Sequence, residues 1–206
     1  MQPQHPPAPL LCLASMSPRR RELLAQIGVA HEVCAPHIDE TVLPGEPPPQ
    51  YVERMARSKA LAVRPAAATP AVLAADTIVV IDGLILGKPA GAAEGVAMLE
   101  RLSGRSHEVL TAVALASGGQ VALRTSTSSV RFRVLTRAEC IAYWDSGEPH
   151  DKAGAYAVQG RGAVFIEHLS GSYSGVMGLP LYETAQLLRA ARIACFPDGV
   201  HRGGFA

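Results

Sequence analysis

An apolar segment with a carboxylate in its middle, AVLAADTIVVI over residues 71–81, constrains the fold of this chain more than any other feature. Its two apolar halves are typical of a buried strand, and Asp76 and Thr77 stand between them. The Asp-Gly pair at 82–83 is a preferred sequence for a type I′ turn, so we expect an antiparallel return through residues 84–86. The segment therefore predicts a buried strand that Asp76 and Thr77 interrupt, followed by a hairpin.

The rest of the chain alternates between strand-like and helix-like patterns. Apolar or alternating runs predict strands at residues 10–14, early in 29–49, twice within 107–134 around the glycines at 118–119, and at 163–168. Capping residues, proline positions and apolar stripes predict helices at residues 18–28, 50–63, 92–102, 136–144 and 180–191. This order predicts an α/β protein with a mixed, twisted sheet flanked by helices. We expect one domain over residues 10–195, between a disordered Pro-rich tail at 1–9 and a C-terminal tail at 196–206.

Composition excludes several classes of protein. A net charge of +1 and an aromatic fraction of 5% argue against a nucleic-acid binder, which needs a basic surface or stacking platforms. No apolar run is long enough to span a membrane and no secretory signal pattern is present, so we expect a cytoplasmic protein. The four cysteines lie far apart without a C-x-x-C pair, which favours buried free thiols over a disulfide framework or a structural zinc site.

Lysine is rare in this sequence. Of the 19 basic residues only three are lysine, Lys59, Lys88 and Lys152, and the others are arginine. A chain that otherwise uses arginine and keeps lysine at three positions is expected to need a compact ammonium group there.

The segment after the first predicted strand is suited to binding an anion. Ser15 and Ser17 precede Pro18, and three arginines then fill the first helical turn, where the helix dipole disfavours cations. Either these arginines extend into solvent, or a phosphate group binds there. Such a group would accept hydrogen bonds from the free N–H groups, and its negative charge would attract the arginines. Arg19, at the mouth of the turn, is the residue that we expect to contact the anion first.

Asp76 is the second unusual feature, because an unpaired carboxylate is costly to bury. It either ends the strand as a turn residue or faces a cleft as a metal ligand or general base, with the Thr77 hydroxyl beside it. The predicted hairpin returns Lys88 next to both residues, where it makes a plain ion pair or binds phosphate.

Two further segments carry polar groups of interest. Lys59 follows Met55 by one helical turn, so it lies at the edge of an apolar stripe and either extends to solvent or serves the site. The Gly-rich loop at 151–160 contains Lys152 and Gln159, and an amide such as Gln159 can both donate to and accept from the edge of a base.

Five motifs in order resemble the Maf family of nucleoside triphosphate pyrophosphatases: L-A-S-x-S-P-R-R, A-A-D-T-I-V, G-K-P, D-K-A-G-A-Y-A-V-Q-G and S-Y-S-G-V-M-G-L-P-L. The match runs from about Leu10 to Arg192. The resemblance implies cleavage of the α–β phosphoanhydride of a nucleotide to a monophosphate and pyrophosphate, with a divalent cation. It also implies a two-lobed α/β fold of the Maf and inosine triphosphatase type, with the site between the lobes, and often a homodimer.

The resemblance also implies roles for individual residues. Asp76 matches the proton acceptor, and it either takes the proton of the attacking water or chiefly holds the metal. Arg19, Thr77 and Gln159 match specificity positions, and the loop that ends in Gln159 is similar to the branch acting on dTTP and UTP, whereas a branch acting on 7-methylated GTP differs there. The full predicted site has Asp76, Lys59 and Lys88 as catalytic groups, Mg²⁺ or Mn²⁺ on Glu40 and Asp76, and substrate contacts from Ser15, Arg19, Arg20, Thr77, Lys152 and Gln159.

Two other functions remain open from the sequence. One is a pyrophosphatase for modified or purine nucleotides, which differs only in the base that the cleft accepts. The other is a nucleotide-binding regulator of cell division that senses the nucleotide without hydrolysing it. A sensor has no need of a base beside the scissile bond, so the carboxylate pair favours the enzyme.

Overall fold

The computed structural model describes residues 11–64 and 71–196. Its strands are β1 (Leu11–Ala14), β2 (Glu32–Cys34), β3 (Ala71–Ile81), β4 (Leu84–Leu86), β5 (Ser106–Ser117), β6 (Gln120–Phe132) and β7 (Ile166–Ser170). Its α-helices are α1 (Pro18–Gln26), α2 (Pro48–Ala62), α3 (Ala92–Leu102), α4 (Arg137–Asp145), α5 (Tyr173–Met177) and α6 (Leu181–Ala190). Three short 3-10 helices lie at Glu148–Asp151, Ala153–Ala155 and Arg161–Phe165. Apart from Phe196, the predicted tails lie outside the described residues.

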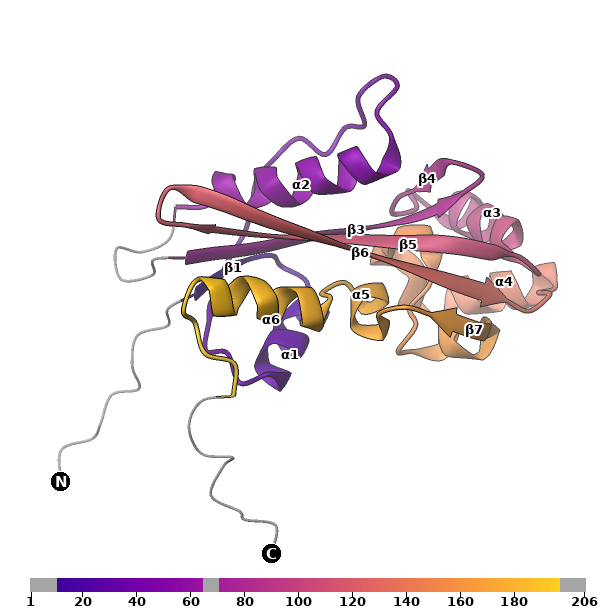
Figure 1. Ribbon diagram of the computed structural model, residues 1–206. Helices are drawn as coiled ribbons and strands as arrows, with labels where there is room; N and C mark the ends of the chain where they lie inside the picture. The colour runs from indigo at the N-terminus through magenta and orange to yellow at the C-terminus, as the bar shows by residue number, and fades with distance from the viewer. Residues whose placement is uncertain (1–10, 65–70, 197–206) are drawn as a thin grey trace, which may run out of the picture.

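The strands form a seven-stranded mixed sheet in the order β2-β1-β3-β5-β6-β7, with β4 also paired to β3. Strand β1 runs parallel to β2 and β3, whereas β3, β5, β6 and β7 pair antiparallel. The predicted mixed α/β class is therefore confirmed. Helix α2 covers one face of the sheet and α1 and α6 cover the other, while α3 and α4 lie at the far end of the long strands (Figure 1).

Strand β3 changes partner in its middle. Strand β5 pairs with it from residue 71 to residue 80, so the other edge is shared by β1 at residues 71–73 and β4 at residues 79–81. Among the described strands, nothing pairs with residues 74–78 on that edge. Asp76 lies in this opening, beside the carboxyl end of β1. A change of strand partner at a carboxyl end is a common place for a binding cleft in α/β sheets.

Three apolar clusters fill the interior. One lies between the sheet and helices α1 and α6, a second lies between the sheet and α2, and a third joins α3, α4 and the far ends of β3, β5 and β6. The third cluster forms a separate lobe, and the long strands connect it to the other two (Figure 1). Within the described part of the chain, no helix combines the length and the apolar character needed to cross a bilayer.

Most predicted elements are present, with three corrections. Asp76 and Thr77 do not interrupt β3, because their backbone pairs with Ala112 and Thr111 of β5. The predicted strand at 163–168 begins only at residue 166, because residues 161–165 form a 3-10 helix. The short helix α5 was not expected. The type I′ turn is confirmed by positive φ angles of 54° and 74° at residues 82 and 83.

Candidate active site

A cavity of about 670 Å³ lies at the opening along β3 and extends between the lobes. All ten predicted site residues line it: Ser15, Arg19, Arg20, Glu40, Lys59, Asp76, Thr77, Lys88, Lys152 and Gln159. They come from the β1–α1 turn, the segment before α2, helix α2, strand β3, the segment after β4 and the Gly-rich loop. Their gathering supports the predicted site, while their individual roles remain predictions.

Arg20 is fixed at the base of the cavity. Its guanidinium donates to the carbonyl oxygen of Gly178 at 2.7 Å, to Ser15 Oγ at 3.3 Å and to Thr77 Oγ1 at 3.2 Å. Thr77 in turn accepts a hydrogen bond of 3.0 Å from Thr111. Burial lowers the pKa of Arg20, and the nearby Asp76 carboxylate opposes this effect. The Ser-x-Ser turn therefore helps to orient Arg20, while the expected contact of Arg19 with an anion stays a prediction.

Lys59 bridges two carboxylates on the opposite side of the base. Its ammonium lies 2.7 Å from Asp76 Oδ1 and 2.9 Å from Glu40 Oε1, and both Lys59 and Asp76 are buried. Partial burial acts to raise the pKa of Glu40, but the hydrogen bond and charge of Lys59 outweigh it and hold that pKa below its ordinary value. The apolar stripe of α2 therefore directs Lys59 into the site and not to solvent.

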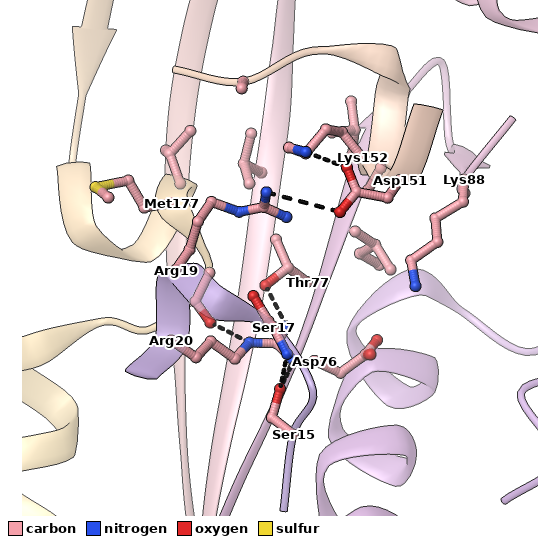
Figure 2. A pocket seen from close by; sticks show the side chains of 18 of the residues that line it. Ser15, Ser17, Arg19, Arg20, Asp76, Thr77, Lys88, Asp151, Lys152 and Met177 are labelled. Atoms are coloured by element: carbon pink, nitrogen blue, oxygen red, sulfur yellow. Dashed lines mark hydrogen bonds and ion pairs between the residues drawn. The ribbon is translucent and has the colours of Figure 1, made fainter. Parts of the chain in front are cut away.

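Lys88 lines the same cavity as Asp76 and Thr77, but among the described residues it forms no ion pair with Asp76. The β3–β4 ladder ends at Leu86, so Lys88 lies beyond the paired residues and its exposed side chain extends into the cavity from the wall opposite Arg19 (Figure 2). Asp76 pairs with Lys59 instead. Lys88 thus supplies positive charge at the mouth of the cavity without neutralising Asp76.

The Gly-rich loop forms the upper wall of the cavity. Lys152 pairs with Asp151, whose second carboxylate oxygen lies 3.9 Å from Arg19 Nη1 (Figure 2). Partial burial acts to raise the pKa of Asp151, but hydrogen bonding and the charge of Lys152 lower it. Gln159 is exposed at the rim. The same wall also includes Tyr156, which the sequence analysis did not select.

Two lining residues that the sequence analysis missed position the others. Tyr51 on α2 donates from its hydroxyl to the backbone oxygen of Glu40 at 2.9 Å, which ties the Glu40 segment to the helix. Asp151 links Arg19 to Lys152. It is the first residue of the D-K-A-G motif, and that motif could have identified it as a site residue. Nothing in the sequence indicated Tyr51, because its contact joins segments 11 residues apart through an irregular chain.

The charges and donors define what the cavity can bind. Five cationic side chains face three carboxylates, which leaves an excess of positive charge for a polyanion such as a triphosphate. Glu40 and Asp76 converge on a single cation, the Lys59 ammonium, and offer hard oxygen donors. Mg²⁺ usually binds through one or two carboxylates together with substrate phosphates, so this donor set fits such an ion.

A cleft with an excess of cationic side chains around a carboxylate pair, in a mixed sheet, defines an α/β protein with a cavity suited to polyanionic ligands. More specifically, the chain belongs to the Maf family, because the family model described as Maf-like protein matches residues 10–191. It is 53% identical over 207 residues to a dTTP/UTP pyrophosphatase of Burkholderia pseudomallei, covering 93% of this chain and 99% of that protein. A dTTP/UTP pyrophosphatase of Burkholderia orbicola is 55% identical over 199 residues, covering 90% and 95% of the two chains.

Among solved structures, the Staphylococcus aureus Ham1 protein is similar over 59% of this chain and 71% of that chain. Its identity is 13% and the TM-score is 0.42, so this similarity carries no argument about the site.

Proposed function

We propose that this chain hydrolyses dTTP and UTP between the α and β phosphorus atoms, releasing a nucleoside monophosphate and pyrophosphate. One observation carries the proposal: two carboxylates meet a buried lysine within a cavity that four further cationic side chains also line. The identity of 53–55% to proteins named dTTP/UTP pyrophosphatase supports the choice of substrates.

The phosphate chain binds among the cations. Arg20 is held at the base by Ser15 and Thr77, so its donors are oriented before the substrate arrives. Lys88 and Lys152 extend from two other walls and neutralise the pyrophosphate as it leaves. We assign Arg19 and Gln159, which line the cavity near the Gly-rich loop, to the nucleoside.

Asp76 activates the water that attacks the α phosphorus. Its Oδ1 accepts from Lys59, which leaves the other oxygen, Oδ2, to accept the proton of the water. Lys59 fixes the orientation of that carboxylate through the same bond. Glu40 and Asp76 would hold a Mg²⁺ or Mn²⁺ ion together with substrate phosphates; when bound, such an ion polarises the phosphoanhydride and neutralises developing charge.

Two wider properties belong to the same proposal. Nucleoside triphosphates are a cytoplasmic pool, which supports a cytoplasmic location for the enzyme. The resemblance to the Maf family supports a homodimer. Light scattering during size-exclusion chromatography tests this point: a mass of twice 21.6 kDa supports the dimer, and 21.6 kDa itself contradicts it.

The test of the proposed reaction is product analysis on a panel of UTP, dTTP, CTP and GTP with Mg²⁺ or Mn²⁺, and with a chelator as control. We expect monophosphate and pyrophosphate, fastest from UTP and dTTP. Diphosphate with inorganic phosphate would contradict cleavage at the α phosphorus. Cleavage confined to purine or modified nucleotides would overturn the assigned substrates, and binding without cleavage would indicate the sensor.

A further inference from the structure

A second cluster of potential metal ligands lies on the edge of the sheet, outside the active-site cavity. In the described part of the chain, one ligand atom from each of Cys12, Glu32 and Cys34 lies within 4.8 Å of the others. Cys12 is fully buried, whereas Glu32 and Cys34 are half-buried. None of the three residues lines the active-site cavity.

The cluster follows from the parallel pairing of β1 with β2. Cys12 lies opposite Glu32, and Ala14 lies opposite Cys34. Because side chains alternate along a strand, Glu32 and Cys34 are on one face, and the pairing places Cys12 on the same face. The two cysteines are 22 positions apart in the chain, so no spacing motif could reveal this arrangement.

Glu32 gives an independent indication of a ligand. Its Oε1 is buried and has no hydrogen-bond partner among the described residues. A buried carboxylate oxygen without a partner is costly, because the group has lost water without gaining another donor. A cation among Oε1 and the two sulfur atoms would remove that cost.

We propose that Cys12, Cys34 and Glu32 bind one Zn²⁺ ion. Two thiolates and a carboxylate match the donors that Zn²⁺ accepts, and water completes the tetrahedron on the partly exposed side of Cys34. On binding, each thiol forms a sulfur–zinc bond and releases its proton to solvent. Zinc–sulfur bonds of about 2.3 Å place tetrahedral ligands about 3.8 Å apart. This spacing is compatible with three ligand atoms that all lie within 4.8 Å of one another.

The geometry favours a metal over a disulfide. Glu32, and not Cys34, lies directly opposite Cys12, so the two cysteines are diagonal neighbours. Paired strands lie about 4.8 Å apart and rise about 3.3 Å per residue, so a diagonal neighbour two residues along is about 8 Å away, whereas a disulfide usually needs a Cα separation below about 7 Å. Bound Zn²⁺ would fasten the three-residue edge strand β2 to β1, and it would stabilise the folded state.

The experiment uses Co²⁺ as a spectroscopic probe for Zn²⁺ on the full, reduced chain. Thiolate ligands give Co²⁺ an intense near-ultraviolet charge-transfer band, which the oxygen ligands Glu40 and Asp76 of the active site cannot produce. We expect this band to saturate at one Co²⁺ per chain and to disappear when one equivalent of Zn²⁺ is added. Zn²⁺ should also raise the thermal midpoint of unfolding.

Variants assign the ligands. We expect Cys34→Ser to abolish the band and the thermal shift, and Glu32→Gln to weaken Zn²⁺ binding at least tenfold, while pyrophosphate release from UTP is unchanged in both. Cys195→Ser, which removes a thiol elsewhere, is the matched control and keeps the band. Absence of the band in the reduced wild-type chain, or its persistence in Cys34→Ser, would overturn the site. A Cys12–Cys34 disulfide that forms readily in air, seen as a loss of two hydrogens by mass, would also overturn it.

Discussion

At the scale of single residues, the site depends on Lys59. Its ammonium contacts Asp76 and Glu40 at 2.7 and 2.9 Å, so its charge compensates both carboxylates. Removing one partner of such a buried pair typically costs about 3–5 kcal/mol, because the other charge is left uncompensated. The pair therefore keeps a charged carboxylate stable in the middle of an apolar strand.

Gln159 is the residue that we propose to read the base. Replacing it with alanine removes an amide that can pair with a base edge, an interaction worth about 1–3 kcal/mol when its partner is left unsatisfied. We expect kcat/KM for UTP and dTTP to fall by about 5- to 150-fold, with a smaller change for CTP and GTP. Steady-state kinetics on the four nucleotides measure this.

The control for this prediction is Gln120→Ala, which removes another exposed glutamine, at the start of β6 and outside the residues that line the cavity. We expect it to leave all four kcat/KM values unchanged. If Gln159→Ala left the order of preference among nucleotides unaltered, Gln159 would not read the base.

At the scale of elements, the Gly-rich loop is positioned by one close contact with β3. Gly154 has a φ of 67°, and a Cβ there would lie 2.8 Å from Val79 Cγ2. Its N–H also donates to the carbonyl oxygen of Gly87 at 3.1 Å. The wall that carries Lys152 is therefore tied both to β3 and to the segment that carries Lys88.

We expect Gly154→Ala to lower the free energy of unfolding by about 2–4 kcal/mol, since it adds a clash to an unfavourable backbone angle. It should also raise KM for UTP by displacing Lys152. Gly83→Ala is the control, because Gly83 has a similar φ of 74° and open space around it. Urea unfolding of both variants measures the difference. Equal losses of stability would show that the contact with Val79 does not fix the loop.

Periodicity and turn chemistry predicted the strands, the hairpin and most helices, because these depend on neighbouring residues. The predicted break at Asp76 was wrong, since the pairing of β3 with β5 and the charge of Lys59 offset the unfavourable burial. The residues of the site were predicted from local anomalies and from the resemblance. The ion pairs that these residues form were not predicted. Whether Lys59 or Lys88 pairs with Asp76 depends on where the β3–β4 ladder ends and on how α2 packs against the sheet.

At the scale of the whole molecule, the stability of the far lobe depends on pH through His107. This residue is buried in contact with the Phe132 and Tyr156 rings, and its Nε2 lies 2.8 Å from the Tyr156 hydroxyl. Burial lowers its pKa to about 4 from 6.5. The unfolded chain therefore takes up a proton at this group at a higher pH than the folded chain does.

The sign follows from this difference in proton binding. Above pH 6.5 His107 is neutral in both states and does not lower the free energy of unfolding. As the pH decreases from 6.5 to about 4, the unfolded chain takes up the proton first and the free energy of unfolding falls; below about 4 this contribution is constant. The shift corresponds to about 3 kcal/mol across the window. We expect urea unfolding to show that the free energy of unfolding falls more between pH 7 and pH 4.5 in the wild type than in His107→Gln. Identical slopes for the two proteins would contradict a buried neutral histidine.

The central claim is that Asp76 activates the attacking water for release of pyrophosphate from UTP. The most direct measurement is pyrophosphate release by Asp76→Asn, with Asp82→Asn on the exposed β3–β4 turn as the matched control and circular dichroism as the check on folding. We predict that Asp76→Asn keeps the wild-type spectrum and loses about 10²-fold or more in kcat, whereas Asp82→Asn retains full activity. A folded Asp76→Asn variant with wild-type turnover would contradict the account.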